Sequence, residues 1–158
     1  KWYTLAAEQG DAEAQYNLGV MNENGQGVPQ DYTEAAKWYT LAAEQGDADA
    51  QYNLALMYED GEGVPQDYKK AVRLYTIAAE QGNAKAQLNL GVMYFNGKGV
   101  LADVVIAHMW FNITAANGDE TGSEYRETLA TLMTPEDISK AQAMARVCMS
   151  SNYEKCGY

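Results

Sequence analysis

The stretch KWYTLAAEQG occupies residues 1–10 and returns letter for letter at residues 37–46, an interval of 36 positions. Residues 1–36 and 37–72 share 27 identities in 36, and the same interval separates Gly10, Gly46, Gly82 and Gly118. A fixed interval of this kind is typical of an array of small structural repeats. We therefore predict three full repeats at 11–46, 47–82 and 83–118, a truncated second helix of an upstream repeat at 1–10, and a helical cap at 119–158.

Each repeat is predicted to hold two helices, as residues 47–82 illustrate. Asp47 is a favourable N-cap for the first helix and Asp67 for the second, while Gly61-Glu62-Gly63-Val64-Pro65 forms a turn between them. Gly82 ends the second helix, and we expect it to be left-handed. Since neither helix can bury its apolar face alone, the pairs must stack. The apolar faces consist of Ala50, Leu54 and Met57/Tyr58 in the first helix and of Ala71, Leu74/Tyr75 and Ala78 in the second.

The third repeat carries the motif that is most typical of a known family. It reads Leu90-Gly91-Val92-Met93-Tyr94-Phe95-Asn96-Gly97-Lys98-Gly99-Val100, followed by Asp103, Ala107 and Trp110-Phe111. This pattern resembles the Sel-one-like repeat (SLR), a subclass of the tetratricopeptide superfamily. The large aromatic residue that tetratricopeptide repeats place before Leu-Gly is replaced by Gln15, Gln51 and Gln87. The resemblance implies an all-α fold, a right-handed α-solenoid of antiparallel helix pairs, and a role in binding or scaffolding other proteins.

The two ends of the chain depart from the repeat in different ways. Residues 119–133 are predicted to form a helix with Tyr125, Leu129 and Leu132 on one face, and Thr134-Pro135-Glu136-Asp137 to start another that continues to about Met149. This pair is expected to seal the array. Lys1 is in phase with a residue inside a helix, so we expect further repeats upstream. An unsealed end would expose Trp2, Leu5 and Ala6, which could support self-association.

Charge and composition exclude several classes of function. The chain has 158 residues and a formal net charge of −11, of which −9 lies in residues 1–72. Nucleic-acid binding needs clustered basic residues, which are missing here, and no apolar run reaches the roughly 18–20 residues of a membrane span. One histidine and two cysteines exclude most zinc sites, and no cofactor is predicted. The acidic half could attract a basic partner, or its carboxylates could simply be a solvated surface.

Cys148 and Cys156 are the only thiols and lie eight positions apart near the end of the chain. We interpret them as a disulfide that ties the last helical turn to the terminal segment, with free thiols or a metal or redox site as alternatives. A disulfide would require an oxidising compartment, and together with the SLR resemblance it leads us to expect a periplasmic or secreted bacterial protein.

The resemblance also indicates where a partner would bind, because first helices line the concave surface of tetratricopeptide arrays. The groove-facing positions combine apolar anchors with Asn amides, which suit an extended peptide backbone. The alternative is that some of them, notably Leu56 and Val92, pack between neighbouring helices. The predicted groove residues are Glu13, Tyr16, Asn17, Val20 and Glu23 in the first repeat, Asp49, Tyr52, Asn53, Leu56 and Glu59 in the second, and Lys85, Leu88, Asn89, Val92 and Phe95 in the third.

Catalytic constellations are not evident. His108 has no nucleophile placed beside it by the sequence, and the Gly-x-Gly loops lack the Lys-Ser/Thr of a phosphate loop. We therefore predict a non-enzymatic protein-binding module. One alternative is a β-lactam-binding or hydrolysing enzyme, as associated with cysteine-rich SLR proteins, although those carry a Cys pair in each repeat. Another is a purely structural stretch of a longer scaffold.

Overall fold

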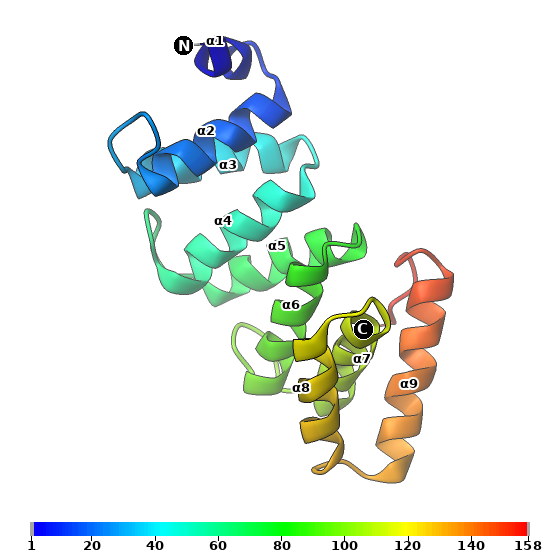
Figure 1. The fold of residues 1–158 in the computed structure, drawn as a ribbon. Helices are drawn as coiled ribbons and strands as arrows, with labels where there is room; N and C mark the ends of the chain where they lie inside the picture. The colour runs from blue at the N-terminus through cyan, green and yellow to red at the C-terminus, as the bar shows by residue number, and fades with distance from the viewer. Residues whose placement is uncertain (1, 158) are drawn as a thin grey trace. The chain divides into compact units, whose positions relative to one another are not determined.

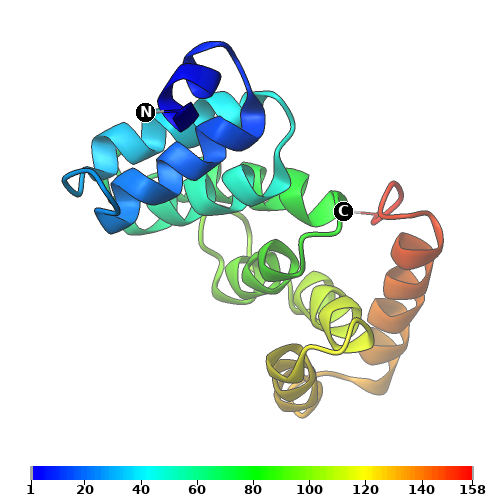
Figure 2. The same cartoon turned by 45° about the horizontal axis from the view of Figure 1, so that its top comes forward.

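The computed structural model is all-helical over residues 2–157, which are the residues it describes, with side chains from residue 4 onward (Figures 1 and 2). The chain divides into two compact units, residues 1–74 (unit 1) and 75–158 (unit 2), and each is described by itself. The all-α prediction is confirmed. The helices are α1 (Trp2–Glu8), α2 (Ala12–Asn24), α3 (Tyr32–Glu44), α4 (Ala48–Asp60), α5 (Tyr68–Glu80), α6 (Ala84–Asn96), α7 (Val104–Ala116), α8 (Glu120–Ala130) and α9 (Pro135–Ser150).

Within each unit, helices pack on their neighbours in the sequence, and α7 also packs on α9. In unit 1, α2 packs against α1 and α3, and α3 packs against α4. In unit 2, α7 packs against α6, α8 and α9. The helix α5 runs across the boundary between the units. This order is that of the predicted stacked helix pairs.

The start of each first helix is set by a side chain that recurs every 36 residues. The Oδ1 atoms of Asp11, Asp47 and Asn83 accept hydrogen bonds from the backbone N–H three residues later, at 2.7, 2.7 and 2.9 Å. These bonds satisfy donors that have no partner within the helix. At the ends of the same helices, Gly25, Gly61 and Gly97 are left-handed, as is Gly82 (φ 86°), for which the sequence predicted it.

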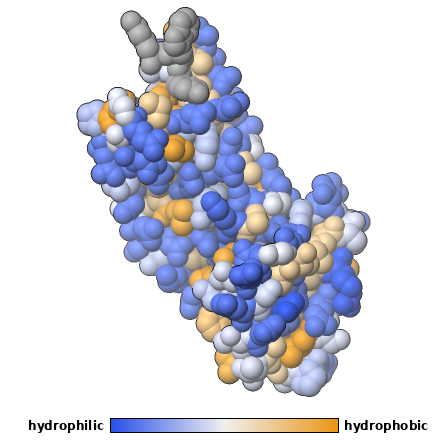
Figure 3. Space-filling model, in the orientation of Figure 1, coloured by the Kyte–Doolittle hydropathy of each residue, from blue (hydrophilic) through white to orange (hydrophobic). Residues whose placement is uncertain are grey.

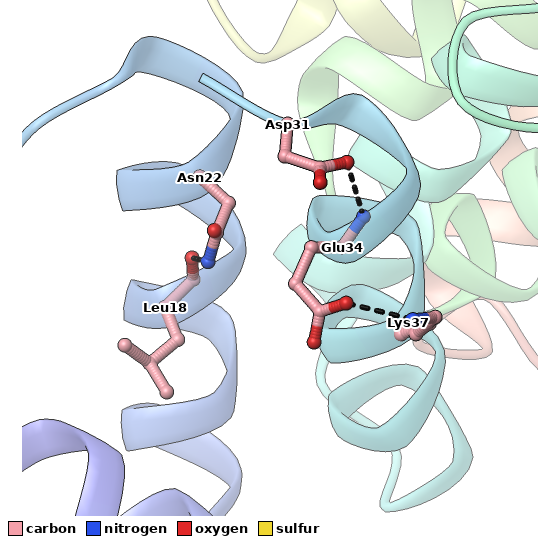
Figure 4. A network of polar contacts seen from close by, with 5 residues as sticks. All are labelled: Leu18, Asn22, Asp31, Glu34 and Lys37. Atoms are coloured by element: carbon pink, nitrogen blue, oxygen red, sulfur yellow. Dashed lines mark hydrogen bonds and ion pairs between the residues drawn. The ribbon is translucent and has the colours of Figure 1, made fainter. Parts of the chain in front are cut away.

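Polar contacts lie on both sides of the turn inside the first repeat, at the end of α2 and at the start of α3 (Figure 4). The backbone N–H of Asp31 donates to the Asn22 carbonyl (2.9 Å), and the Asp31 carboxylate accepts from the Glu34 N–H (3.0 Å). Glu34 pairs with Lys37 at 2.7 Å, and the Asn22 amide donates to the Leu18 carbonyl at 2.8 Å. The bond from Asp31 to Asn22 joins the two sides of the turn, whereas the other contacts stabilise the end of α2 and the first turns of α3.

The glutamines that replace the tetratricopeptide aromatic residue have a structural role. Each is buried and donates from Nε2 to a carbonyl of the helix that precedes it. This bond satisfies the buried glutamine amide, which would be costly if unpaired, and it ties one repeat to the next. The bonds join Gln15 to Ala7 (3.0 Å), Gln51 to Ala43 (3.2 Å) and Gln87 to Ala79 (3.1 Å).

The predicted apolar faces form the core. Ala50, Leu54 and Met57 are buried in α4, and Ala71, Tyr75 and Ala78 are buried in α5. Tyr58 and Leu74 are only half-buried. The side chain of Trp2, which we expected at an exposed end of the array, lies outside the residues whose side chains are described, whereas Leu5 is half-exposed.

The Leu-Gly pair of the motif allows a second helix to approach closely. A Cβ added to Gly91 would lie 2.6 Å from the Phe111 ring, and one added to Gly19 would likewise overlap the Tyr39 ring. Both aromatic residues are buried. The glycine of the motif therefore provides the space that the aromatic side chain of the following helix occupies.

The cap begins as predicted and differs at one boundary. Thr134 caps α9, Pro135 occupies its first turn, and Thr134 Oγ1 accepts from the Asp137 N–H at 3.2 Å. The preceding helix α8 ends at Ala130 and not at Met133, because the N–H groups of Leu132 and Met133 bond three residues back and tighten the end into a turn.

Candidate binding surface

The predicted groove residues lie on the first helices α2, α4 and α6, within units 1 and 2. Glu13, Asp49, Lys85 and Phe95 are exposed. The remainder are half-buried, so each has part of its side chain within the fold: Tyr16, Asn17, Val20, Glu23, Tyr52, Asn53, Leu56, Glu59, Leu88, Asn89 and Val92.

Several polar groove residues of unit 1 contact one another beneath the surface. The hydroxyl of the fully buried Tyr39 donates to Glu23 Oε2 at 2.5 Å. The Tyr16 and Tyr39 rings lie 5.9 Å apart, tilted by 41°. The Asn53 amide, from the next first helix, lies against both hydroxyls. These side chains therefore join α2, α3 and α4 as well as facing outward.

This cluster raises the pKa of both tyrosines above the usual value of 10. For Tyr39 the main cause is burial of the hydroxyl, followed by the hydrogen bond to Glu23 and its negative charge. For Tyr16 burial again comes first, followed by the charge of Asp49. The hydrogen bond to Asn53 acts in the opposite direction on each. Both hydroxyls therefore stay protonated in the folded protein.

The raised pKa of Tyr39 predicts a loss of stability in alkali. Above about pH 10 the unfolded state releases the tyrosine proton that the folded state keeps, so the free energy of unfolding falls by up to about 1.4 kcal/mol per pH unit for this group. Tyr39→Phe should lower stability at pH 7 by roughly 1–2 kcal/mol, because Glu23 loses its donor. It should also make the decline in the free energy of unfolding above pH 10 less steep. Urea denaturation at a series of pH values would measure both effects. Parallel pH profiles for the two proteins would contradict this assignment, since all other tyrosines are common to both.

A contact between an asparagine amide and a buried tyrosine hydroxyl also occurs in unit 2. Asn89 Nδ2 donates to the hydroxyl of the buried Tyr75 at 3.1 Å. Asn89 and Tyr75 are the 36-residue equivalents of Asn53 and Tyr39. One amide N–H of Asn89 is thus used within the fold.

An apolar pocket of about 290 Å³ lies among α6, α7 and α8 in unit 2. Two of the predicted groove residues, Val92 and Phe95, lie on its α6 side. The Phe111 ring meets the Tyr125 ring edge-on, with centroids 5.3 Å apart. The other lining residues are Asn96, Thr128, Leu129 and Leu132.

Three large apolar side chains around this pocket are exposed. Phe95 is 44%, Tyr125 43% and Leu132 72% exposed. The sequence placed Tyr125, Leu129 and Leu132 on one face of the cap, where they were expected to seal the array. Only Leu129 is buried, so the face is partly open. On the face drawn in Figure 3, apolar side chains appear as separate patches within a mainly hydrophilic surface.

The sequence did not identify the cap helix as part of an apolar pocket. Its composition differs from the repeats, so the 36-residue interval gives no equivalent position for Tyr125, Thr128 or Leu132. The available signal was the apolar spacing in the helix, which does not distinguish a buried face from an exposed one.

The sole histidine is a buried structural residue. His108 is 1% exposed, and its Nδ1 lies 2.8 Å from Asn112 Nδ2. Burial, and secondarily the charge of Arg126, lowers the pKa of His108 below its usual value. Within the described part of the chain, no three His, Cys, Asp or Glu side chains are grouped as metal ligands. None of the described helices has both the length and the apolar character for crossing a membrane.

Comparison with known proteins settles the family. The profile of the Sel1 repeat matches residues 1–11, 12–47, 48–83 and 84–119. The chain belongs to the Sel1 repeat family. Proteins of this family are typically protein–protein interaction modules and generally non-enzymatic scaffolds. No curated protein matches the chain.

Two solved structures show what Sel1 repeats of this kind look like. A Sel1 repeat protein from Oxalobacter formigenes is 33% identical with a TM-score of 0.72, over 96% of this chain and 55% of that one. The protein c5321, a protective antigen present in uropathogenic Escherichia coli strains and displaying an SLR fold, is 29% identical with a TM-score of 0.65, over 98% and 41%. The predicted α-solenoid class is thereby confirmed. The chain spans about half the length of these relatives or less.

Proposed function

We propose that this Sel1 repeat chain binds a peptide segment of a partner protein on its first helices, with the apolar pocket of unit 2 as the main anchor site. The observation that carries the proposal is that Phe95, Tyr125 and Leu132 remain exposed around one concave pocket. Apolar side chains clustered in this way are costly in water and are typical of interaction sites.

The surroundings suit a peptide. A pocket of about 290 Å³ is large enough for one bulky apolar side chain, and Asn96 at its edge offers an amide to a peptide backbone. In unit 1, the exposed carboxylates of Glu13 and Asp49 would favour basic residues in a partner by electrostatic steering.

A peptide-display selection against the intact chain would test this function. Peptides that are enriched should carry an aromatic or large aliphatic residue. Phe95→Ala and Leu132→Ala should each lower the affinity for a selected peptide by roughly 5–30-fold, because each removes part of an apolar anchor site. Leu101→Ala is the matched control, since Leu101 is 91% exposed on the loop before α7 and does not line the pocket.

A blocking variant makes the test sharper. Thr128 is exposed and lines the pocket, so Thr128→Arg should place a charge among the apolar side chains and abolish binding while the fold persists. Selected peptides that bind this variant as tightly as the wild type would contradict the proposal.

The localisation we propose is an oxidising compartment, the periplasm or the exterior of a bacterial cell. Its support is the disulfide between Cys148 and Cys156 together with the bacterial origin of the structural relatives. No observation among the described residues favours the alternative of a β-lactam-directed enzyme.

A further inference from the structure

A second pocket, of about 230 Å³, lies among α7, α8 and α9 in unit 2, apart from the apolar pocket. The two have no lining residue in common. The second pocket combines apolar side chains, among them Ala145 and Met149, with four polar ones: Asn112, Arg126, Gln142 and Arg146.

The arginines are the unusual feature of this pocket. The chain contains three, at positions 73, 126 and 146, and two of them line this one pocket from two helices. No carboxylate is among the described residues that line it. In a chain whose net charge is −11, two guanidinium groups at one site mark a local positive region.

Only one of these guanidinium groups has a described acidic partner, and that pair is open to water. Arg126 Nη2 lies 3.2 Å from Glu127 Oε1, with side chains that are 35% and 74% exposed. Exposed pairs of this kind contribute little to stability. A ligand anion can therefore replace Glu127 at small cost.

Asn112, one of the four polar lining residues, already makes contacts within the fold. The Asn112 amide donates to the His108 carbonyl at 2.9 Å and lies 2.8 Å from His108 Nδ1, so its N–H groups are directed to His108. Since burial and Arg126 keep the buried imidazole neutral, it adds no positive charge. The donors left for a ligand are those of Arg126, Arg146 and Gln142.

We propose that this pocket binds a carboxylate carried on a short aliphatic chain. A guanidinium presents parallel N–H donors that match the two oxygens of a carboxylate, which a lone ammonium group does not. Ala145 and Met149 provide an apolar wall for the chain behind the carboxylate. The pocket is smaller than the roughly 300–1,000 Å³ of sites for drug-sized ligands, so the ligand is small or is the end of a larger molecule.

The test is an NMR titration of the 158-residue protein with hexanoate. The backbone amide signals of residues 112, 142 and 145 should shift saturably, whereas hexanamide, which has the same shape without the charge, should shift them at least about tenfold more weakly. Arg126→Gln and Arg146→Gln should each weaken hexanoate binding at least about tenfold. Arg73→Gln, which removes the third arginine outside the pocket, should leave the affinity unchanged.

Two more variants keep the test independent of folding defects. Glu127→Gln should tighten hexanoate binding, because it removes the competitor of Arg126, and a gain cannot result from misfolding. Arg146→Lys keeps the positive charge but loses the planar pair of N–H donors, so its hexanoate affinity should lie between those of the wild type and Arg146→Gln. Phe95→Ala should have no effect, which separates this site from the proposed peptide site.

Three results would overturn the proposal. The first is equal binding of hexanoate and hexanamide. The second is an equal loss of hexanoate affinity in Arg73→Gln and in the two pocket variants, Arg126→Gln and Arg146→Gln. The third is tighter binding of inorganic phosphate than of hexanoate. The source of the carboxylate is distinguished by a blocked peptide with a free C-terminus and its amidated form. Tighter binding of the free peptide than of hexanoate identifies a chain end, and weaker binding a free acid; both support a carboxylate site.

Discussion

In the 158-residue chain, Gly63→Ala is expected to destabilise unit 1 by at least about 3 kcal/mol, whereas the same change at Gly27 should cost only about 1–2 kcal/mol. The two glycines occupy the same place in consecutive repeats, with φ values of 71° and 74°. Both substitutions therefore pay the cost of a left-handed alanine. They differ in what the new methyl group meets.

At Gly63 an added Cβ would lie 2.8 Å from the backbone nitrogen of Thr33 and closer still to the carbonyl of Tyr32. These backbone atoms belong to the junction at which α3 begins, so they cannot move without disturbing its first turn. At Gly27 the nearest atom is the terminal methyl of Met21, at 3.7 Å, which is ordinary contact. Overlap with backbone is the additional cost at Gly63 alone.

Urea denaturation monitored by circular dichroism would measure both changes on the same chain. Because the residue, the substitution and the backbone conformation are matched, the difference between the variants isolates the packing of one repeat's turn against the preceding repeat. Equal destabilisation by Gly63→Ala and Gly27→Ala would show that the turn of the second repeat does not pack against the start of α3 as described.

This comparison also shows what the sequence can and cannot predict. The sequence predicted the helix pairs, the caps at Asp47 and Asp67, and the left-handed Gly82, because each depends on neighbours in the sequence. The sequence does not predict how closely Gly63 approaches Tyr32 and Thr33, since that contact is made with another repeat. Rules based on neighbouring residues in the sequence therefore predict a helix pair, but not its contacts with other repeats.

The same limit explains the candidate sites. Val92 and Phe95, which were predicted to face a groove, line the apolar pocket from α6, but the pocket is completed by Tyr125 and Leu132, whose positions follow no repeat. Asn89 was predicted to orient a ligand, and the structure shows that it also bonds to the buried Tyr75. Both facts depend on packing between helices, which a single sequence does not encode in its spacing.

Loss of the disulfide between Cys148 and Cys156 is the second large effect we expect. The bond joins the last turn of α9 to the terminal segment, eight residues apart. Closing a loop of this size is worth roughly 2–3 kcal/mol through the entropy of the unfolded chain. Cys148→Ser/Cys156→Ser should lower the free energy of unfolding by about that amount.

The bond also holds a segment with an unfavourable backbone. Asn152 and Tyr153 both have positive φ, 53° and 67°, which residues other than glycine adopt at a cost. Tyr153 is kept in place by its N–H bond to the Cys148 carbonyl (2.8 Å) and by a bond from Asn117 to its hydroxyl (3.3 Å). Its ring lies beside Gly82, so the segment covers the ends of two repeat turns.

Hydrogen exchange and urea denaturation, each with and without reductant, would separate these contributions. In the wild type, reductant should speed exchange of the Tyr153 amide and lower the midpoint of unfolding, while the double serine variant should not respond to it. Tyr153→Phe with the disulfide intact should cost less, about 1 kcal/mol or below, because it removes only the hydroxyl contact. A reductant-insensitive midpoint in the wild type would show that the contacts of Tyr153, and not the covalent bond, hold the terminal segment against the repeats.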